Sequence, residues 1–255
     1  MARISIYDST LRDGAQAQGI SYSVGDKLKI VERLDALGVS YIEAGNPGSN
    51  PKDLEFFVRA TNLKLAHARI IAFGATRKVG IRVTEDVGLQ SLLKAGTPAI
   101  AIFGKSWDYQ VLEILRTTLD ENLHMISDTV RYLKQHGKEV VFDAEHFFDG
   151  YKDNAEYALK SLAAAAEAGA DSLALCDTNG GSFPEEIFEI TRIVCAKFPH
   201  VAVGIHCHNE SEMAVDNCRR AVQAGARPRQ GMDNGLGEDR RHAHPCSVTA
   251  NLPLK

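Results

Sequence analysis

One arrangement recurs along this chain: a helical stretch ends at a glycine, and an apolar run follows and stops at a polar residue. It is found at residues 34–45, 92–104, 133–145, 166–177 and 222–233. Each glycine suits the left-handed backbone position that ends a helix. The continuous apolar runs are typical of strands that are covered on both faces. The recurrence therefore predicts parallel strands that alternate with helices.

Further strands are expected at Ile4–Asp8, Arg69–Thr76 and Val201–His208, which brings the predicted total to eight. Eight βα units in a chain of 255 residues predict a (β/α)8 barrel, an α/β fold known as the TIM barrel. An open doubly wound sheet is the alternative, but no glycine-rich nucleotide-binding motif follows the first strand. The eighth strand holds Pro228, which cannot donate a hydrogen bond to a neighbouring strand. No linker divides the chain, so residues 1–255 are expected to form one domain.

The composition indicates a soluble protein: 44% of the residues are hydrophobic and 24% are charged. The 29 Lys and Arg residues and 33 Asp and Glu residues give a net charge of −4, which argues against a nucleic-acid partner. No apolar run is long enough to cross a membrane, and no signal pattern stands at the N-terminus. Five cysteines without framework spacing are typical of reduced thiols. We therefore expect a cytoplasmic protein with no membrane partner.

Polar residues stand where the predicted strands end. In a barrel these carboxyl ends form one face, and that face carries the active site. In chain order the residues are Asp8, Glu43, Thr76, Lys105, Glu145, Asp177 with Thr178, His206 with His208, and Asn234.

Two of these residues, His206 and His208, have the spacing of metal ligands. Side chains alternate between the faces of a strand, so the two imidazoles point the same way and Cys207 points oppositely. An isolated pair of this kind is more often structural. The charged loop after the first strand reverses this balance, because Asp8 or Asp13 could supply a carboxylate. Such a set suits Zn, Mn, Fe or Mg.

Several polar residues also have a structural interpretation. Ser182 and Ser211 precede helical patterns and are expected to cap those helices. Thr178 could contribute to capping the helix after the sixth strand. Glu145 could be a solvated strand end, and Lys105 is more often a rim residue than a catalyst. The arginine of the charged loop, Arg12, could hold a carboxylate or stabilise an enolate, because its planar donors match both.

Six segments of the chain resemble one enzyme family. They are DSTLRDGAQ (8–16), IEAGNPGSNPKDLEFF (42–57), FGKSWD (103–108), DAEHFFDGYKDN (143–154), LCDTNGG (175–181) and GIHCHN (204–209). Together they resemble the metal-dependent Claisen-condensing family that includes the 2-isopropylmalate and homocitrate synthases. The resemblance extends from Ser5 to about Gly237, and FGKSWD and DAEHFFDGYK favour its citramalate branch.

The resemblance implies a metal site and one departure from the family pattern. Asp13, His206 and His208 match the metal ligands of the family, which leaves Asp8 as a residue that ends the strand or supports a metal ligand. In the segment after the eighth strand, His242 replaces the asparagine that is a further metal contact in the family, and it could still bind the ion. The expected cofactor is a divalent metal, namely Mn, Mg or Zn.

The resemblance also implies catalytic and substrate-binding residues. Arg12 matches the arginine that stabilises the enolate oxygen or the ketoacid, and Glu145 matches the active-site glutamate. Thr178 matches the threonine that contacts the ketoacid carboxylate. Glu43 lies where the family has a glutamate near the substrate, and Asn234 is a further expected substrate contact.

The implied reaction is the condensation of acetyl-CoA with pyruvate to give citramalate and CoA, a step of branched-chain amino-acid biosynthesis. A homodimer is also expected. Full-length relatives continue into helical and regulatory regions that are expected to be absent here. Two alternatives are a metal-dependent pyruvate aldolase or lyase on the same barrel, and a shortened metal-binding barrel with little activity.

Overall fold

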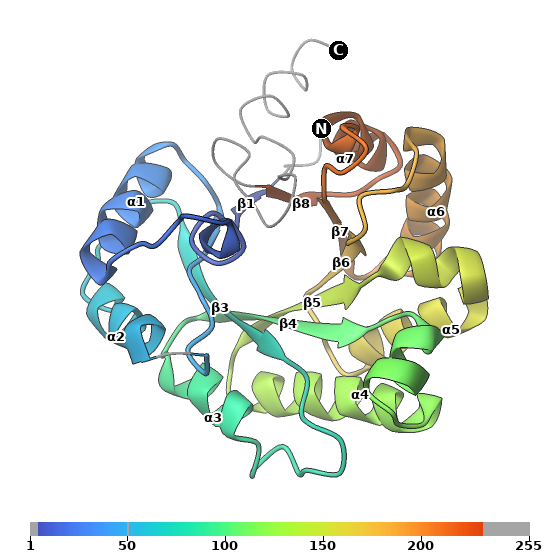
Figure 1. Ribbon diagram of the computed structural model, residues 1–255, viewed down its shortest axis with the longest axis horizontal. Coiled ribbons are helices and arrows are strands. Elements are labelled where there is room, and N and C mark those ends of the chain that lie inside the picture. Colours follow the sequence, from blue (N-terminus) through green and yellow to red (C-terminus); the bar gives the residue numbers. More distant parts are fainter. Residues whose placement is uncertain (1–4, 50, 232–255) are drawn as a thin grey trace.

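The structure is a computed structural model that describes residues 5–49 and 51–231 (Figure 1). Eight parallel strands pair in chain order and close into a barrel, with β8 against β1. The strands are β1 (Ser5–Asp8), β2 (Tyr41–Glu43), β3 (Arg69–Ala75), β4 (Ala99–Lys105), β5 (Glu139–Glu145), β6 (Ser172–Asp177), β7 (Ala202–Cys207) and β8 (Pro228–Gly231). The predicted fold class is confirmed.

Helices surround the strands, as Figure 1 shows. They are α1 (Val24–Ala36), α2 (Pro51–Ala60), α3 (Val87–Lys94), α4 (Leu119–Gln135), α5 (Phe147–Glu167), α6 (Pro184–Lys197) and α7 (Ala214–Gln223), with a 3-10 turn η1 (Gly14–Gln16) and a π-helical turn η2 (Gln110–Ile114). The five glycines of the recurring arrangement all have a positive φ, from 70° at Gly96 to 114° at Gly225. This conformation confirms that they end the helices. Within the described residues, no helix has the length and apolar character needed to cross a membrane.

The two faces of the strands contribute to two separate hydrophobic cores. Outward residues such as Ile42, Phe142 and Ile205 are fully buried in one large core with the helices. Side chains that point into the barrel, among them those of Ile71 and Ala101, form a second and smaller core. The helix-covered core stabilises the barrel, and the small inner core leaves the carboxyl-end face to polar residues.

The strand that contains Pro228 is compatible with the barrel because the proline is its first residue. The preceding residue makes the hydrogen bonds on both sides. Arg227 N–H donates to the carbonyl oxygen of Val203 at 2.9 Å, and its own carbonyl accepts from Ser5 N–H at 3.3 Å. The missing donor of Pro228 therefore does not interrupt the closure of the barrel.

The expectation that two serines cap helices is wrong. Ser182 Oγ donates to Asp177 Oδ1 at 2.9 Å, and the N-cap residue of α6 is Phe183. Ser211 Oγ donates to the carbonyl oxygen of Gly180 at 2.6 Å, whereas Asn209 Oδ1 accepts from the first helical N–H of α7. Both serine hydroxyls instead bond acceptors at the end of β6 and in the loop after it, and the N-cap residues of α6 and α7 are Phe183 and Met213.

One buried carboxylate ties α1 to the segment before β3. Asp35 accepts backbone hydrogen bonds from Ala66, His67 and Ala68 at 2.9, 2.8 and 2.7 Å. Burial raises the pKa of Asp35, but the three amide donors together lower it by more than burial raises it. The net pKa therefore lies below its ordinary value. The carboxylate is thus stabilised in the folded state.

Asp35→Asn should lower the free energy of unfolding by about 1–3 kcal/mol at neutral pH, because three charge-assisted bonds weaken. The stabilisation by Asp35 is fully present above its unfolded-state pKa of about 3.9 and is lost as the pH falls through the lower folded-state pKa. Urea unfolding at neutral and acidic pH measures both effects. Glu32→Gln, an exposed charge change on the same helix, is the matched control and should leave stability unchanged.

Candidate active site

The loop after β1 folds into a compact turn that brings Asp13 over the barrel. Three successive amides, of Arg12, Asp13 and Gly14, donate to the carbonyl oxygen of Ser9 at 3.1, 2.9 and 3.2 Å. Asp8 holds the start of the turn, because its carboxylate accepts from Thr10 N–H at 3.0 Å and from Thr10 Oγ1 at 3.1 Å. Asp8 is therefore engaged in the turn, and Asp13 is the carboxylate that reaches the strand ends.

Asp13, His206 and His208 lie together at this end of the barrel. One ligand atom from each residue lies within 4.8 Å of those of the other two. The two imidazole rings have centroids 5.3 Å apart, and His206 Nε2 is 3.7 Å from Asp13 Oδ2. Cys207 packs into the outer core, as the strand alternation predicts. The structure therefore brings together three of the four residues that the sequence analysis expects to bind metal.

This cluster fits a divalent metal ion. Two imidazoles and a carboxylate are a usual ligand set for Zn, Mn and Fe. Asp13 and His206 are 3% and 4% exposed, so an ion held by them would be largely shielded from solvent. The carboxylates of Asp13, Asp143 and Glu145 and the guanidinium of Arg12 line the cavity around the cluster, and Lys105 pairs with Glu145. The carboxylates outnumber these two cations, which favours a bound cation.

Arg12 lies beside the cluster and is held on three sides. Its Nε donates to Glu43 Oε2 at 2.5 Å, and its Nη1 is 3.0 Å from Asp13 Oδ2. Its guanidinium also stacks over the Phe73 ring, 3.9 Å from the ring centroid. Burial lowers the pKa of Arg12, but the carboxylates of Glu43 and Asp13 raise it by more than burial lowers it. The net pKa is therefore above its ordinary value. Arg12 is a fixed and permanently charged donor.

Glu43 lies behind Arg12 and does not line the cavity. It is fully buried, and its Oε1 accepts from the Tyr7 hydroxyl at 2.6 Å. Burial raises the pKa of Glu43, although the Arg12 charge and the two hydrogen bonds oppose this effect. Glu43 thus contacts Arg12 rather than the cavity, and its expected role in catalysis and substrate binding stays a prediction.

Glu145 and Thr178 line the same cavity from the ends of β5 and β6. Glu145 forms an ion pair with Lys105, which the sequence analysis treats as a rim residue. The Thr178 hydroxyl accepts from His146 N–H at 2.9 Å, and the N-cap residue of α6 is Phe183, so the idea that Thr178 caps α6 is wrong. Thr178 stands five residues before this N-cap residue, and its hydroxyl instead joins the ends of β5 and β6.

The cavity that contains these residues has a volume of about 240 Å³. Five of its lining residues are not predicted from the sequence; they are Gln16, Phe73, Phe103, Asp143 and Cys176. Phe103, Asp143 and Cys176 stand two residues before Lys105, Glu145 and Thr178. Because side chains alternate along a strand, counting back by two from each rim residue would have found these three.

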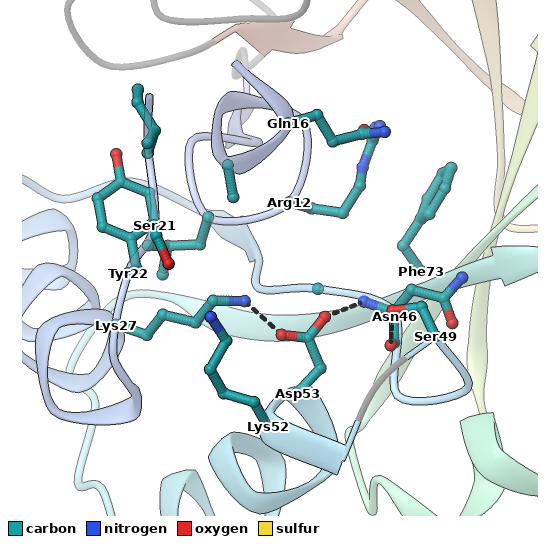
Figure 2. A pocket seen from close by; sticks show the side chains of 14 residues that line it. Arg12, Gln16, Ser21, Tyr22, Lys27, Asn46, Ser49, Lys52, Asp53 and Phe73 are labelled. Carbon is teal, nitrogen blue, oxygen red and sulfur yellow. Dashed lines mark hydrogen bonds and ion pairs between the residues drawn. The ribbon is translucent and has the colours of Figure 1, made fainter. Parts of the chain in front are cut away.

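A second cavity, of about 280 Å³, adjoins the first and shares Arg12, Gln16 and Phe73 with it. Figure 2 shows its floor, where Lys27 Nζ bonds Asp53 Oδ1 at 2.8 Å and Asp53 Oδ2 accepts from Asn46 N–H at 3.0 Å. Lys52 also lines this cavity and is exposed. The two cavities therefore meet at Arg12.

The other two residues expected in the site, Asn234 and His242, lie outside the described residues. Their expected contributions to substrate and metal binding stay predictions.

Comparison with known proteins places the chain in a family. A family model described as HMGL-like matches residues 3–249. The chain belongs to the HMGL-like family. The (R)-citramalate synthases of Aquifex aeolicus (strain VF5) and Sulfolobus acidocaldarius are 54% and 50% identical to this HMGL-like chain, over 99% of it and 48% of each relative. The 2-isopropylmalate synthase of Sulfolobus acidocaldarius is 33% identical, over 98% of the chain and 62% of the relative.

A solved structure supports the fold of this HMGL-like chain. The HMG-CoA lyase of Brucella melitensis superimposes with a TM-score of 0.83 at 18% identity, over 100% of this chain and 91% of that one. At this identity the likeness concerns the fold alone. The chain spans about half the length of the (R)-citramalate synthases it matches, 48% in both cases above.

Proposed function

We propose that this chain is the catalytic barrel domain of an (R)-citramalate synthase, an acyltransferase that condenses acetyl-CoA with pyruvate to give citramalate and CoA. The observation that carries the proposal is the placement of Arg12 against the Asp13–His206–His208 cluster within one cavity. The identity of 54% and 50% to two (R)-citramalate synthases supports the choice of substrates.

The cavity offers partners for each part of pyruvate. Thr178 and Arg12 supply a hydroxyl and a guanidinium for a carboxylate, and both line the cavity. The ion, when bound by Asp13, His206 and His208, would act as a Lewis acid on the keto group. Arg12 would offset the negative charge that develops on oxygen during the reaction. Because three contacts already hold its guanidinium, Arg12 would not have to reorient as this charge develops.

Proton transfer from acetyl-CoA needs a base near the same point. Glu145 is our candidate within the described residues, because it lines the cavity and is held by Lys105. An ion pair fixes the direction of the carboxylate, which is a requirement for a positioned base.

Acetyl-CoA would approach through the second cavity, which opens onto Arg12 (Figure 2). The buried Lys27–Asp53 pair stiffens the floor of this cavity. Lys52 supplies a positive charge at its rim, which suits a CoA phosphate. The two substrates would then meet at the arginine shared by both cavities.

The proposal also includes the identity of the metal ion, the cellular compartment and the oligomeric state. The proposed ion is Mn, Mg or Zn, and calorimetric titration with each metal compares their binding affinities. The enzyme would work in the cytoplasm, where acetyl-CoA is used in biosynthesis, and the whole protein would form a homodimer, which light scattering measures.

A panel of ketoacids tests the proposed substrate. CoA release from acetyl-CoA should be fastest with pyruvate and slower by about 10-fold or more with 2-oxoisovalerate, since each added carbon must fit a small cavity. Mass spectrometry should identify the product with pyruvate as citramalate. Faster release with the larger ketoacid would contradict the proposal. Formation of pyruvate from citramalate without acetyl-CoA or CoA would instead indicate a lyase.

A further inference from the structure

A carboxylate outside the active-site cavity connects the ends of β5 and β6. Asp149 Oδ2 accepts from Asn179 Nδ2 at 2.9 Å and lies 3.3 Å from His146 Nδ1. Because a carboxylate only accepts, the proton of the second contact is on Nδ1 of the imidazole. His146 directly follows Glu145, and Asn179 directly follows Thr178. Asp149 therefore bridges the neighbours of two residues that line the cavity.

The backbone of His146 has a left-handed conformation, with φ 53° and ψ 35°. A residue with a side chain rarely adopts this conformation, and it persists only where surrounding contacts maintain it. His146 N–H donates to Thr178 Oγ1 at 2.9 Å, and the His146 carbonyl accepts from Gly150 N–H at 2.9 Å. The bridge through Asp149 holds the ring of the same residue. The turn after β5 is thus fixed through both the backbone and the side chain of His146.

The amide of His146 determines how Thr178 can bind a ligand. A threonine hydroxyl has one proton to donate and two lone pairs that accept. The His146 N–H occupies one lone pair, and within residues 5–49 and 51–231 the hydroxyl donates to no protein group. Its proton is therefore available to an acceptor in the cavity, such as the carboxylate of a ketoacid.

We propose that Asp149 is a positioning residue, whose bridge between His146 and Asn179 holds the His146 amide on Thr178 and so directs the Thr178 proton to the ketoacid carboxylate. The effect on catalysis rests on the proposed function of the cavity. The geometric part concerns the bond between His146 and Thr178, and it can be tested without substrate.

The carboxylate can be removed without disturbing the packing of α5 at this point. The next residue, Gly150, lies so close to the loop after β4 that an added Cβ would be 2.5 Å from the carbonyl oxygen of Ser106. Phe147 and Phe148, just before Asp149, are fully buried. These contacts do not involve the Asp149 side chain. Alanine at position 149 should therefore leave the backbone in place and remove the bridge alone.

Asp149→Ala should raise KM for pyruvate by about 10-fold and leave kcat within about 2-fold. The carboxylate of pyruvate does not react, so a weaker contact from Thr178 affects the substrate and the transition state alike. Asp153→Ala is the matched control, because this carboxylate of the same helix bonds Trp107 Nε1 at 2.9 Å instead. In the control, KM and kcat should both stay within about 2-fold of the unaltered protein.

Two measurements distinguish positioning from a general loss of structure. The first is a double-mutant cycle with Thr178→Val, in which Asp149→Ala should have no further effect on KM because the hydroxyl it positions is gone. The second is hydrogen exchange of the His146 amide without substrate. Exchange should be faster by about 10-fold in Asp149→Ala, because the bond to Thr178 opens more often, and unchanged in Asp153→Ala.

Unchanged exchange of the His146 amide in Asp149→Ala would overturn the proposal, even in a protein that carries out the condensation normally. An unchanged KM, or effects that add to those of Thr178→Val, would overturn it as well. A lack of condensation by the unaltered protein would contradict the proposed function instead. The exchange rates would then still decide whether Asp149 holds His146 on Thr178.

Discussion

Asp13→Ala should abolish metal-dependent binding of pyruvate to this protein. The variant removes the only carboxylate of the three-residue cluster and leaves two imidazoles. Changes to residues that merely support metal ligands already reduce affinity by about 10–100-fold, so loss of a ligand should reduce it by more than about 100-fold. Calorimetric titration with the metal, and then with pyruvate, measures both effects. His206→Ala should behave in the same way.

Asp8→Asn is the matched control for this experiment. Asp8 stands five residues earlier and bonds Thr10 within the same turn. Asparagine keeps one oxygen acceptor for Thr10, so the turn should persist and the loss of metal affinity should be far smaller than in Asp13→Ala. Pyruvate binding that survives in Asp13→Ala, or that is lost only in Asp8→Asn, would show that the ion is held elsewhere.

Arg12→Lys should preserve the fold and most of the metal affinity but lower kcat by about 100–1,000-fold. A lysine ammonium cannot reach Glu43 and Asp13 with separate N–H groups in one plane, as Arg12 Nε and Nη1 do. It also loses the stacking of the guanidinium on Phe73. The rate of CoA release measures the effect, and the melting temperature monitors the fold.

Arg69→Lys controls for the loss of a guanidinium in a barrel ion pair. Arg69 pairs with Glu139 at the opposite end of the strands. This variant should retain the rate, whereas a normal rate in Arg12→Lys would show that Arg12 is structural.

Much of the barrel could be predicted because its signals are local. The glycines that end helices and the apolar runs after them repeat with the βα unit, and every glycine of the repeat has a positive φ. The alternation of side chains along a strand was enough to place His206 and His208 on one face and Cys207 on the other. These properties depend only on neighbours in the sequence.

The errors and omissions concern contacts that depend on the path of the chain in three dimensions. Lys105 and Glu145 form an ion pair because they are register partners on β4 and β5. The sequence of one strand alone does not determine its register with its neighbour. The choice between Asp8 and Asp13 depends on the path of the turn after β1. The sequence around Ser182 predicts a helix cap, because it does not show that the hydroxyl lies against Asp177.

The most direct test of the proposed activity is release of free CoA thiol when the metal-loaded protein meets acetyl-CoA and pyruvate, with Asp13→Ala measured beside it. We predict release that requires pyruvate, yields citramalate and is lost in the variant. Release that continues in Asp13→Ala, or no pyruvate-dependent release from a protein that binds both metal and pyruvate, would contradict the claim that this barrel carries out the condensation.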